Sequence, residues 1–238
     1  MNDQHGLERC LTFINCQVQP PARPLTAVQE SVPRRAVTIS RQCGSGGHAV
    51  AERLLEHLQA QAPENACPWA IFDRNLVEKV LEDHKLPSRL AKFMPEDRTS
   101  EISDTLDELF GLHPPSLTLV RQTAETILHL AELGNVILIG RAANVITAKL
   151  NYVFHVRLVG TLEKRAKYLQ EVQHLSPKDA LELVHREDLG RSRYLRKYFD
   201  KDINDPLLYH LVINTDLVSF EEASQLIAKA MMPEKVEA

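Results

Sequence analysis

The segment from Ala36 to His48 constrains this chain more than any other. It reads Ala-Val-Thr-Ile-Ser-Arg-Gln-Cys-Gly-Ser-Gly-Gly-His, so a short apolar, β-branched run leads directly into a glycine-rich turn. Apolar residues then recur every three to four positions, which predicts a helix; they are Val50, Ala51, Leu54, Leu55 and Leu58. In a strand, glycine loop and helix of this order, backbone N–H groups and the positive end of the helix dipole converge on one point, which suits a phosphate.

The loop departs from the phosphate-binding pattern G-x-x-x-x-G-K-[ST]. When the end of the strand is aligned, Arg41 takes the place of the first glycine and Gly46 that of the second. Gly47 then stands where the lysine belongs, and His48 stands where the serine or threonine belongs. The alternative to a phosphate site is a tight turn between any strand and helix.

We nevertheless predict that this loop binds phosphate groups. The hydroxyl of Ser45 would bind a phosphate oxygen or the water shell of a metal ion, and Arg41 and His48 would supply part of the missing positive charge. Histidine in the first turn of a helix is also common as an ordinary surface residue. The predicted phosphate-binding residues are Arg41, Gly44, Ser45, Gly46, Gly47 and His48.

Composition narrows the possible partners. The 28 Lys and Arg residues against 32 Asp and Glu give a formal net charge of −4, so no overall basic field attracts nucleic acid or an anionic membrane. No apolar run approaches the length of about 18 residues that spans a bilayer. Residues 1–20 lack the basic and apolar regions of a secretory signal, so we expect a cytoplasmic protein.

Cysteine and histidine patterns give no sign of a metal site or of cross-links. The four cysteines are scattered without a C-x-x-C pair; they are Cys10, Cys16, Cys43 and Cys67. Because the chain shows no export signal, we predict no disulfides. The ten histidines have no metal-ligand spacing, so we expect no metal ion held by protein side chains alone.

Alternating strands and helices predict the domain organisation. Residues 1–33 contain several prolines and are expected to be a mostly irregular extension, or one docked on the surface. Residues 34–232 form the main domain and 233–238 a tail. The alternation predicts a parallel sheet covered on both faces, with the ligand beyond the carboxyl ends of the strands. The predicted strands are Ala36–Ser40, Trp69–Phe72, Val136–Ile139, Tyr152–Arg157 and Tyr209–Asn214.

Helices fill the remaining segments, and two insertions interrupt the alternation. Helix-start signals stand at Thr161, at Ser176-Pro177, and at Ser219, where Glu222 completes a capping box. The first insertion, 84–133, is predicted to be helical over Ser100–Phe110 and Ser116–Leu133. The second, 176–205, is dense in charge.

Two further sets of residues stand at the ends of predicted strands. Asp73 follows the second strand, where a carboxylate would bind a sugar hydroxyl, orient the attacking phosphate or hold Mg²⁺. Asp73 would serve equally well as the N-cap of a helix that begins at Arg74. Gly140 and Arg141 follow the third strand, and this arginine would form a bidentate contact with a phosphate, or else pair with a surface acid.

The second insertion is rich in arginine. If it is helical, Arg186 and Arg193 share one face, and Arg191 lies on another. Such a charge run is often a solvated helix face. Beside a phosphate crevice, it would instead be a lid that excludes water and stabilises charge on a transferring phosphoryl group.

Together these segments resemble the cytidylate kinase-like family of P-loop nucleoside monophosphate kinases, over about residues 34–232. The motifs are Thr38-Ile39-Ser40-Arg41 with Gly44-Ser45-Gly46-Gly47, Phe72-Asp73-Arg74, Ile139-Gly140-Arg141, Arg193-x₄-Tyr198-Phe199, and Asp205-Pro206-x₂-Tyr209-His210-Leu211-x₂-Asn214-Thr215. The resemblance implies a three-layer α/β/α fold with a five-stranded parallel sheet, a helical monophosphate-binding insertion at 84–133 and a helical lid at 176–205.

The resemblance also implies a function. The protein would move the γ-phosphoryl group of ATP, with Mg²⁺, to a nucleoside monophosphate such as CMP. Arg74, Gly140 and Arg141 would bind the acceptor. The predicted catalytic residues are Arg186, Arg191, Arg193 and Asp73. Two alternatives stay open: a non-catalytic nucleotide-binding regulatory protein with the same fold, and a kinase for a non-nucleotide metabolite.

Overall fold

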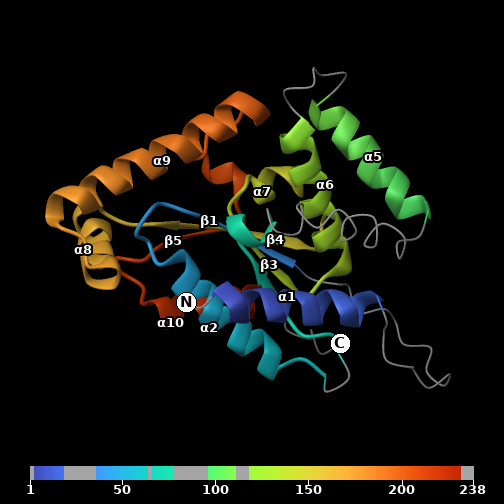
Figure 1. Ribbon diagram of the computed structural model, residues 1–238, viewed down its shortest axis with the longest axis horizontal. Coiled ribbons are helices and arrows are strands. Elements are labelled where there is room, and N and C mark those ends of the chain that lie inside the picture. Colours follow the sequence, from blue (N-terminus) through green and yellow to red (C-terminus); the bar gives the residue numbers. More distant parts are fainter. Residues whose placement is uncertain (1–2, 19–35, 64–65, 78–95, 111–117, 232–238) are drawn as a thin grey trace, which may run out of the picture.

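Five parallel strands form the centre of the molecule in a computed structural model that describes residues 3–18, 36–63, 66–77, 96–110 and 118–231 (Figure 1). Their order across the sheet is β2-β3-β1-β4-β5. The strands are β1 (Ala36–Arg41), β2 (Ala70–Phe72), β3 (Val136–Ile139), β4 (Val153–Val159) and β5 (Leu211–Asn214). All five predicted strands are confirmed, with ends that differ by up to two residues.

Helices cover both faces of this sheet, which confirms the three-layer α/β/α prediction. Helices α2 (Gly47–Ala60) and α10 (Phe220–Met231) pack on one face, against side chains such as Val37 and Ile39 of β1. Helices α6 (Thr118–Leu133) and α7 (Ala143–Ile146) pack on the other face. The inner strand β3 is buried on both sides, so its sequence is a continuous apolar run rather than an alternating one, whereas Val212 on the edge strand β5 is exposed.

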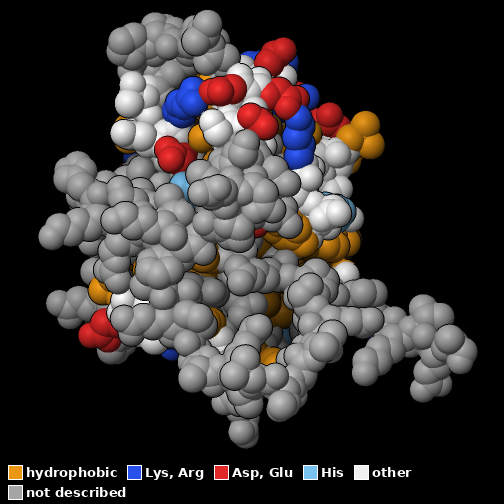
Figure 2. Space-filling model, turned by 90° about the vertical axis from the view of Figure 1, so that its right-hand side faces the viewer, with side chains coloured by type: hydrophobic (Ala, Val, Ile, Leu, Met, Phe, Trp, Pro, Cys, Tyr) orange, Lys and Arg blue, Asp and Glu red, His pale blue; other side chains and the backbone are white. Residues whose placement is uncertain are grey.

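The predicted insertion at 84–133 contains two helices. Helix α5 (Glu96–Phe110) begins four residues before the predicted helix, and α6 matches the second one; residues 84–95 and 111–117 lie outside the described residues. Ion pairs of Asp107 with Arg121 and of Glu108 with Lys149 connect α5 to its neighbours. Acidic and basic side chains accordingly lie close together on the described part of this face (Figure 2).

The second insertion contains one long helix. Helix α8 (Leu162–Gln173) follows β4 and packs against α9 (Pro177–Phe199), which runs from there toward α7, and these two helices form an arm (Figure 1). The side chain of Ser176 caps α9 by accepting a hydrogen bond from Asp179 N, as the Ser-Pro signal predicts. A short 3₁₀ helix, η2 (Pro206–Leu208), leads into β5.

The beginning of the chain corrects two predictions. Residues 3–18 form helix α1 (Asp3–Val18) instead of irregular structure, and its Phe13 ring packs edge-on against Phe72 of the edge strand β2, with ring centroids 5.8 Å apart. This docking brings Cys16 beside Cys67, and the two form a disulfide that the sequence argued against. Residues 19–33 and the predicted tail at 233–238 lie outside the described residues.

Within the described ranges, no helix is both long enough and apolar enough to cross a bilayer.

Candidate active site at the glycine loop

The glycine loop connects β1 to α2 at the carboxyl end of the sheet. Gly44 and Gly46 have φ angles of +81° and +76°, a left-handed conformation that favours glycine. A Cβ atom at Gly44 would overlap the carbonyl of Arg165, and one at Gly46 would overlap the ring of Phe220. Gly46 is also the N-cap of α2 and provides no side-chain cap. The first N–H groups of this helix therefore have no capping side chain from that residue.

Hydrogen bonds attach the loop to β4. Gln42 N donates to Leu158 O at 3.0 Å, and the Gln42 side-chain oxygen accepts from Gly160 N at 2.9 Å. Ser45 is 1% exposed, and its hydroxyl donates to Gln42 O at 2.8 Å. The hydroxyl that we expected to face a phosphate thus stabilises the loop itself.

Arg41 lies across the loop. A Cβ atom at Gly47 would come within 2.9 Å of Arg41 Cγ, and one at Gly140 would overlap the guanidinium. Burial, together with the nearby positive charge of Arg191, lowers the pKa of Arg41 to about 10, so it remains protonated at neutral pH. Its side chain therefore fills the space beside position 47, where P-loop kinases carry their lysine.

Arg165, in the first turn of α8, holds three parts of the structure together. Its Nε donates to Gly160 O at 2.9 Å, and its Nη1 donates to Cys43 O at 2.8 Å. The same Nη1 lies 2.7 Å from Oδ2 of Asp188, on α9. Asp188 Oδ1 in turn accepts from Cys43 N at 2.7 Å. The glycine loop is therefore attached to both helices of the arm.

The lid arginines divide into two groups. Arg191 pairs with Asp188 at 3.2 Å and with Glu187 at 3.3 Å, and its positive charge partly offsets the rise that burial causes in the pKa of the Cys43 thiol. The side chain of Arg186 is 73% exposed and approaches Glu187 only to 3.9 Å, and Arg193 is exposed. The structure thus brings Arg191 to the loop and leaves Arg186 and Arg193 facing solvent.

Asp73 follows β2 and has two partners. Its Oδ1 accepts from Leu76 N at 3.0 Å, which confirms the N-cap role, and its Oδ2 lies 3.1 Å from Nε2 of His48. Burial alone would raise the pKa of Asp73, but the hydrogen bonds from His48 and from backbone N–H groups outweigh it and lower this pKa. His48 therefore points at a carboxylate rather than over the loop. Arg74 is exposed at the start of the helix.

The turn after β3 is conformationally strained. Gly140, Arg141 and Ala142 have φ angles of +80°, +53° and +58°, and the last two residues rarely adopt this left-handed region. The guanidinium of Arg141 lies 6.0 Å from the ring centroid of Tyr194 on α9. Strain of this kind tends to persist where it serves a function, so the turn that carries Arg141 is a candidate part of the site.

Arg157, on β4, is a buried cation that the sequence analysis treated only as the end of a strand. It is 4% exposed and donates to Ser40 Oγ at 2.9 Å and to Asn204 Oδ1 at 3.3 Å. Tyr209 covers the guanidinium at 5.8 Å. Burial is the main cause that lowers the pKa of this arginine.

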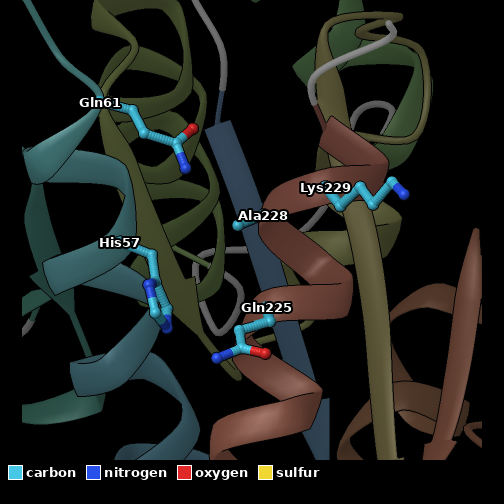
Figure 3. Close-up of a pocket in the computed structure, with 5 residues that line it drawn as sticks. All are labelled: His57, Gln61, Gln225, Ala228 and Lys229. Atoms are coloured by element: carbon cyan, nitrogen blue, oxygen red, sulfur yellow. The ribbon is translucent and has the colours of Figure 1, made fainter.

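Two grooves differ in their relation to the loop. One of about 180 Å³ lies beside it, lined by Gly44, Lys164, Arg165, Tyr168, Thr215, Asp216 and Phe220. The other, of about 280 Å³, lies between α2 and α10 and is lined by His57, Gln61, Gln225, Ala228 and Lys229 (Figure 3). His57 is ten residues beyond Gly47, about 15 Å along the helix, so this second groove is remote from the loop.

A magnesium ion at this site would need ligands beyond the described side chains. Among the described residues, no cluster of three or more His, Cys, Asp or Glu side chains has metal-binding geometry. Asp73 is a carboxylate that could hold the ion, with phosphate oxygens and water completing the six positions that Mg²⁺ requires. A bound Mg²⁺ would neutralise charge on the phosphates of the nucleotide.

Sequence reasoning missed Arg165, Asp188 and Arg157 as site residues. The only available signals were an arginine at the end of a buried strand and an acid three positions before Arg191 in the charge run. Neither pattern differs from that of an ordinary surface residue until the partner, which is far away in the sequence, is known.

Comparison with known proteins agrees with this geometry. The sequence profile of the cytidylate kinase-like family matches residues 36–217. The chain belongs to this family. The match confirms the resemblance inferred from the motifs, and it covers the sheet, the glycine loop and the arm but not α1. A protein of the cytidylate kinase-like family is of the phosphotransferase class, whereas the substrate is not determined by the match.

Three solved structures are similar to this cytidylate kinase-like protein to different degrees, and the first of them shares its fold. An uncharacterised protein from Eubacterium ventriosum is 20% identical, with a TM-score of 0.64, over 83% of this chain and 98% of that one. A shikimate kinase from Bacteroides thetaiotaomicron is 11% identical, with a TM-score of 0.46, and the match covers 83% of this chain and 98% of that kinase. A gluconokinase from Sinorhizobium meliloti is 11% identical, with a TM-score of 0.40, and the match covers 84% of this chain and 92% of that kinase. No curated protein sequence matches the chain.

Proposed function

We propose that this protein transfers the γ-phosphoryl group of ATP to a nucleoside monophosphate such as CMP, with arginines in place of the loop lysine. One observation carries the proposal: the guanidinium groups of Arg41, Arg165 and Arg191 surround a glycine loop that has no lysine. Phosphoryl transfer needs phosphates held in position and charge neutralised, and preorganised arginines can do both.

The donor nucleotide would bind at the loop, with its base in the adjoining groove. Tyr168 and Phe220 meet edge-on there, with centroids 5.3 Å apart, and offer apolar surface for a planar base. The phosphates would then reach the uncapped N–H groups at the start of α2.

The acceptor would bind across the crevice. Arg141, held in the strained turn, would contact its phosphate, with Gly140 allowing close approach and Arg74 nearby. Asp73 would orient the attacking group. Arg191 would stabilise charge on the transferring phosphoryl group, whereas Arg186 and Arg193 would need α9 to move before they reached it.

A coupled ADP-release assay over nucleoside monophosphates tests the proposal. We expect turnover with a pyrimidine monophosphate and none with sugars or alcohols. Arg191→Ala should lower kcat more than it raises KM, while the matched variant Arg186→Ala should change kcat less than about threefold. ATP binding without turnover on any acceptor would instead indicate a non-catalytic nucleotide-binding module. Turnover with a sugar alone would indicate a metabolite kinase.

A further inference from the structure

The carboxylate of Asp188 occupies the glycine loop. It comes from helix α9, yet its Oδ1 accepts from the loop N–H of Cys43 at 2.7 Å and from Arg191 at 3.2 Å. Its Oδ2 accepts from the buried Arg165 at 2.7 Å. Both oxygens are therefore held by donors from three separate segments: the loop, α8 and α9.

These donors are the kind that would bind a phosphate. A backbone N–H of a glycine loop and two arginine guanidiniums form charge-assisted hydrogen bonds with any oxyanion, whether carboxylate or phosphate. The side chain of Asp188 is 28% exposed, and that of Arg165 is 8% exposed. Asp188 is thus more exposed than the buried Arg165 that binds it, so an incoming anion could reach it from solvent.

We propose that the carboxylate of Asp188 occupies the anion site of the loop and competes there with phosphate. A phosphate group of the nucleotide would bind as Asp188 releases its hydrogen bond from Cys43 N–H, so this competition determines the affinity of the site for phosphate. Two anions cannot share these donors without strong repulsion, so exchange is required. When Asp188 leaves, Arg191 loses one of its two carboxylates and becomes available to the phosphate. The inference rests on the proposed function only in taking the loop to be the phosphate site.

A purely structural role for Asp188 predicts the opposite result. If the carboxylate only holds the arm to the loop, its loss should loosen the site and weaken anion binding. If it competes with the phosphate, its neutralisation should strengthen binding even though the fold becomes less stable. The sign of the change in affinity therefore separates the two roles.

Isothermal titration with pyrophosphate and with Mg·ATP measures this sign on the full chain. Asp188→Asn keeps the size and an oxygen acceptor but removes the charge. We expect both ligands to bind about tenfold more tightly, as expected for losing a partly screened repulsion a few ångströms away. The control is Glu182→Gln, which makes the same charge change at an exposed position of the same helix. It should alter the affinity less than twofold.

The outcomes distinguish this inference from the proposed function. If wild-type protein binds ATP and Asp188→Asn binds it equally or more weakly, Asp188 is structural, and the proposed function is unaffected. If neither protein binds either ligand, the loop is not an anion site, and both proposals fail.

A measurement on wild-type protein covers the case in which Asp188→Asn does not fold. With ¹⁵N-labelled cysteine, the amide resonance of Cys43 should shift in proportion to bound pyrophosphate, because its acceptor changes. An unchanged Cys43 resonance at saturation would overturn the exchange.

Discussion

Replacing Arg165 with alanine should destabilise the fold more than any surface ion-pair change. The arginine is 7% exposed and makes hydrogen bonds to the carbonyls of Gly160 and Cys43, besides its pair with Asp188. Removing one partner of a buried ion pair typically costs about 3–5 kcal/mol, because the other charge is left behind. In the variant, Asp188 would still pair with Arg191 and contact water. We therefore expect a loss of about 3 kcal/mol, at the lower end of this range.

Urea unfolding of the oxidised protein measures this loss. With a slope of about 2 kcal/mol per molar urea, the midpoint should fall by about 1.5 M with the slope unchanged. The matched control is Arg53→Ala, whose side chain is 41% exposed and lies 3.6 Å from Glu221. An exposed pair of this kind contributes about 1 kcal/mol or less. Equal midpoints for the two variants would refute the view that Arg165 holds the loop to the arm.

Three further changes test other parts of the structure. Gly47→Lys combined with His48→Ser restores the P-loop pattern, but it should weaken ATP binding, because the Arg41 side chain already fills the space beside position 47. Tighter ATP binding in a calorimetric titration would show that this space is open. Cys16→Ser removes the cross-link over 51 residues and should lower stability by about 4 kcal/mol in oxidised protein. With a thiol reductant present, this variant and wild type should melt alike. Burial and the neighbouring imidazole of His210 lower the pKa of His155 to about 4 in the folded protein. Between pH 6.5 and pH 4, His155 therefore binds a proton in the unfolded state but not in the folded state. Stability should therefore fall as the pH drops from 6.5 to 4, by about 3 kcal/mol in all, and His155→Asn should flatten that slope in melts at several pH values.

The structure also changes how one obvious experiment should be interpreted. Gly46→Val appears from the sequence to be a selective block of phosphate binding. A Cβ atom there would instead overlap the ring of Phe220, at a left-handed residue. The variant would therefore strain the fold at α10 as well, and lost ATP binding would not by itself locate the phosphate.

Elements set by local sequence were predictable. The strands are short runs rich in apolar and β-branched residues, as β1 and β3 show. The capping box at Ser219 is formed as its spacing predicts, with Glu222 N donating to Ser219 Oγ at 3.2 Å. The glycine loop was also recognisable, because left-handed turns need glycine at the positions now held by Gly44 and Gly46. These features depend on interactions within a few residues, so the sequence carries them directly.

Tertiary structure decided the rest. The sequence by itself determined the strands, their order along the chain, the loop and the family motifs. It did not determine that α1 docks on β2, which pairs Cys16 with Cys67. Nor did it determine that Arg165 on α8 pairs with Asp188 on α9. It also left open that Arg191, rather than Arg186, faces the loop. A charged side chain has the same local pattern whether it meets water or a buried partner, and only the packing of distant segments determines which of the two it meets.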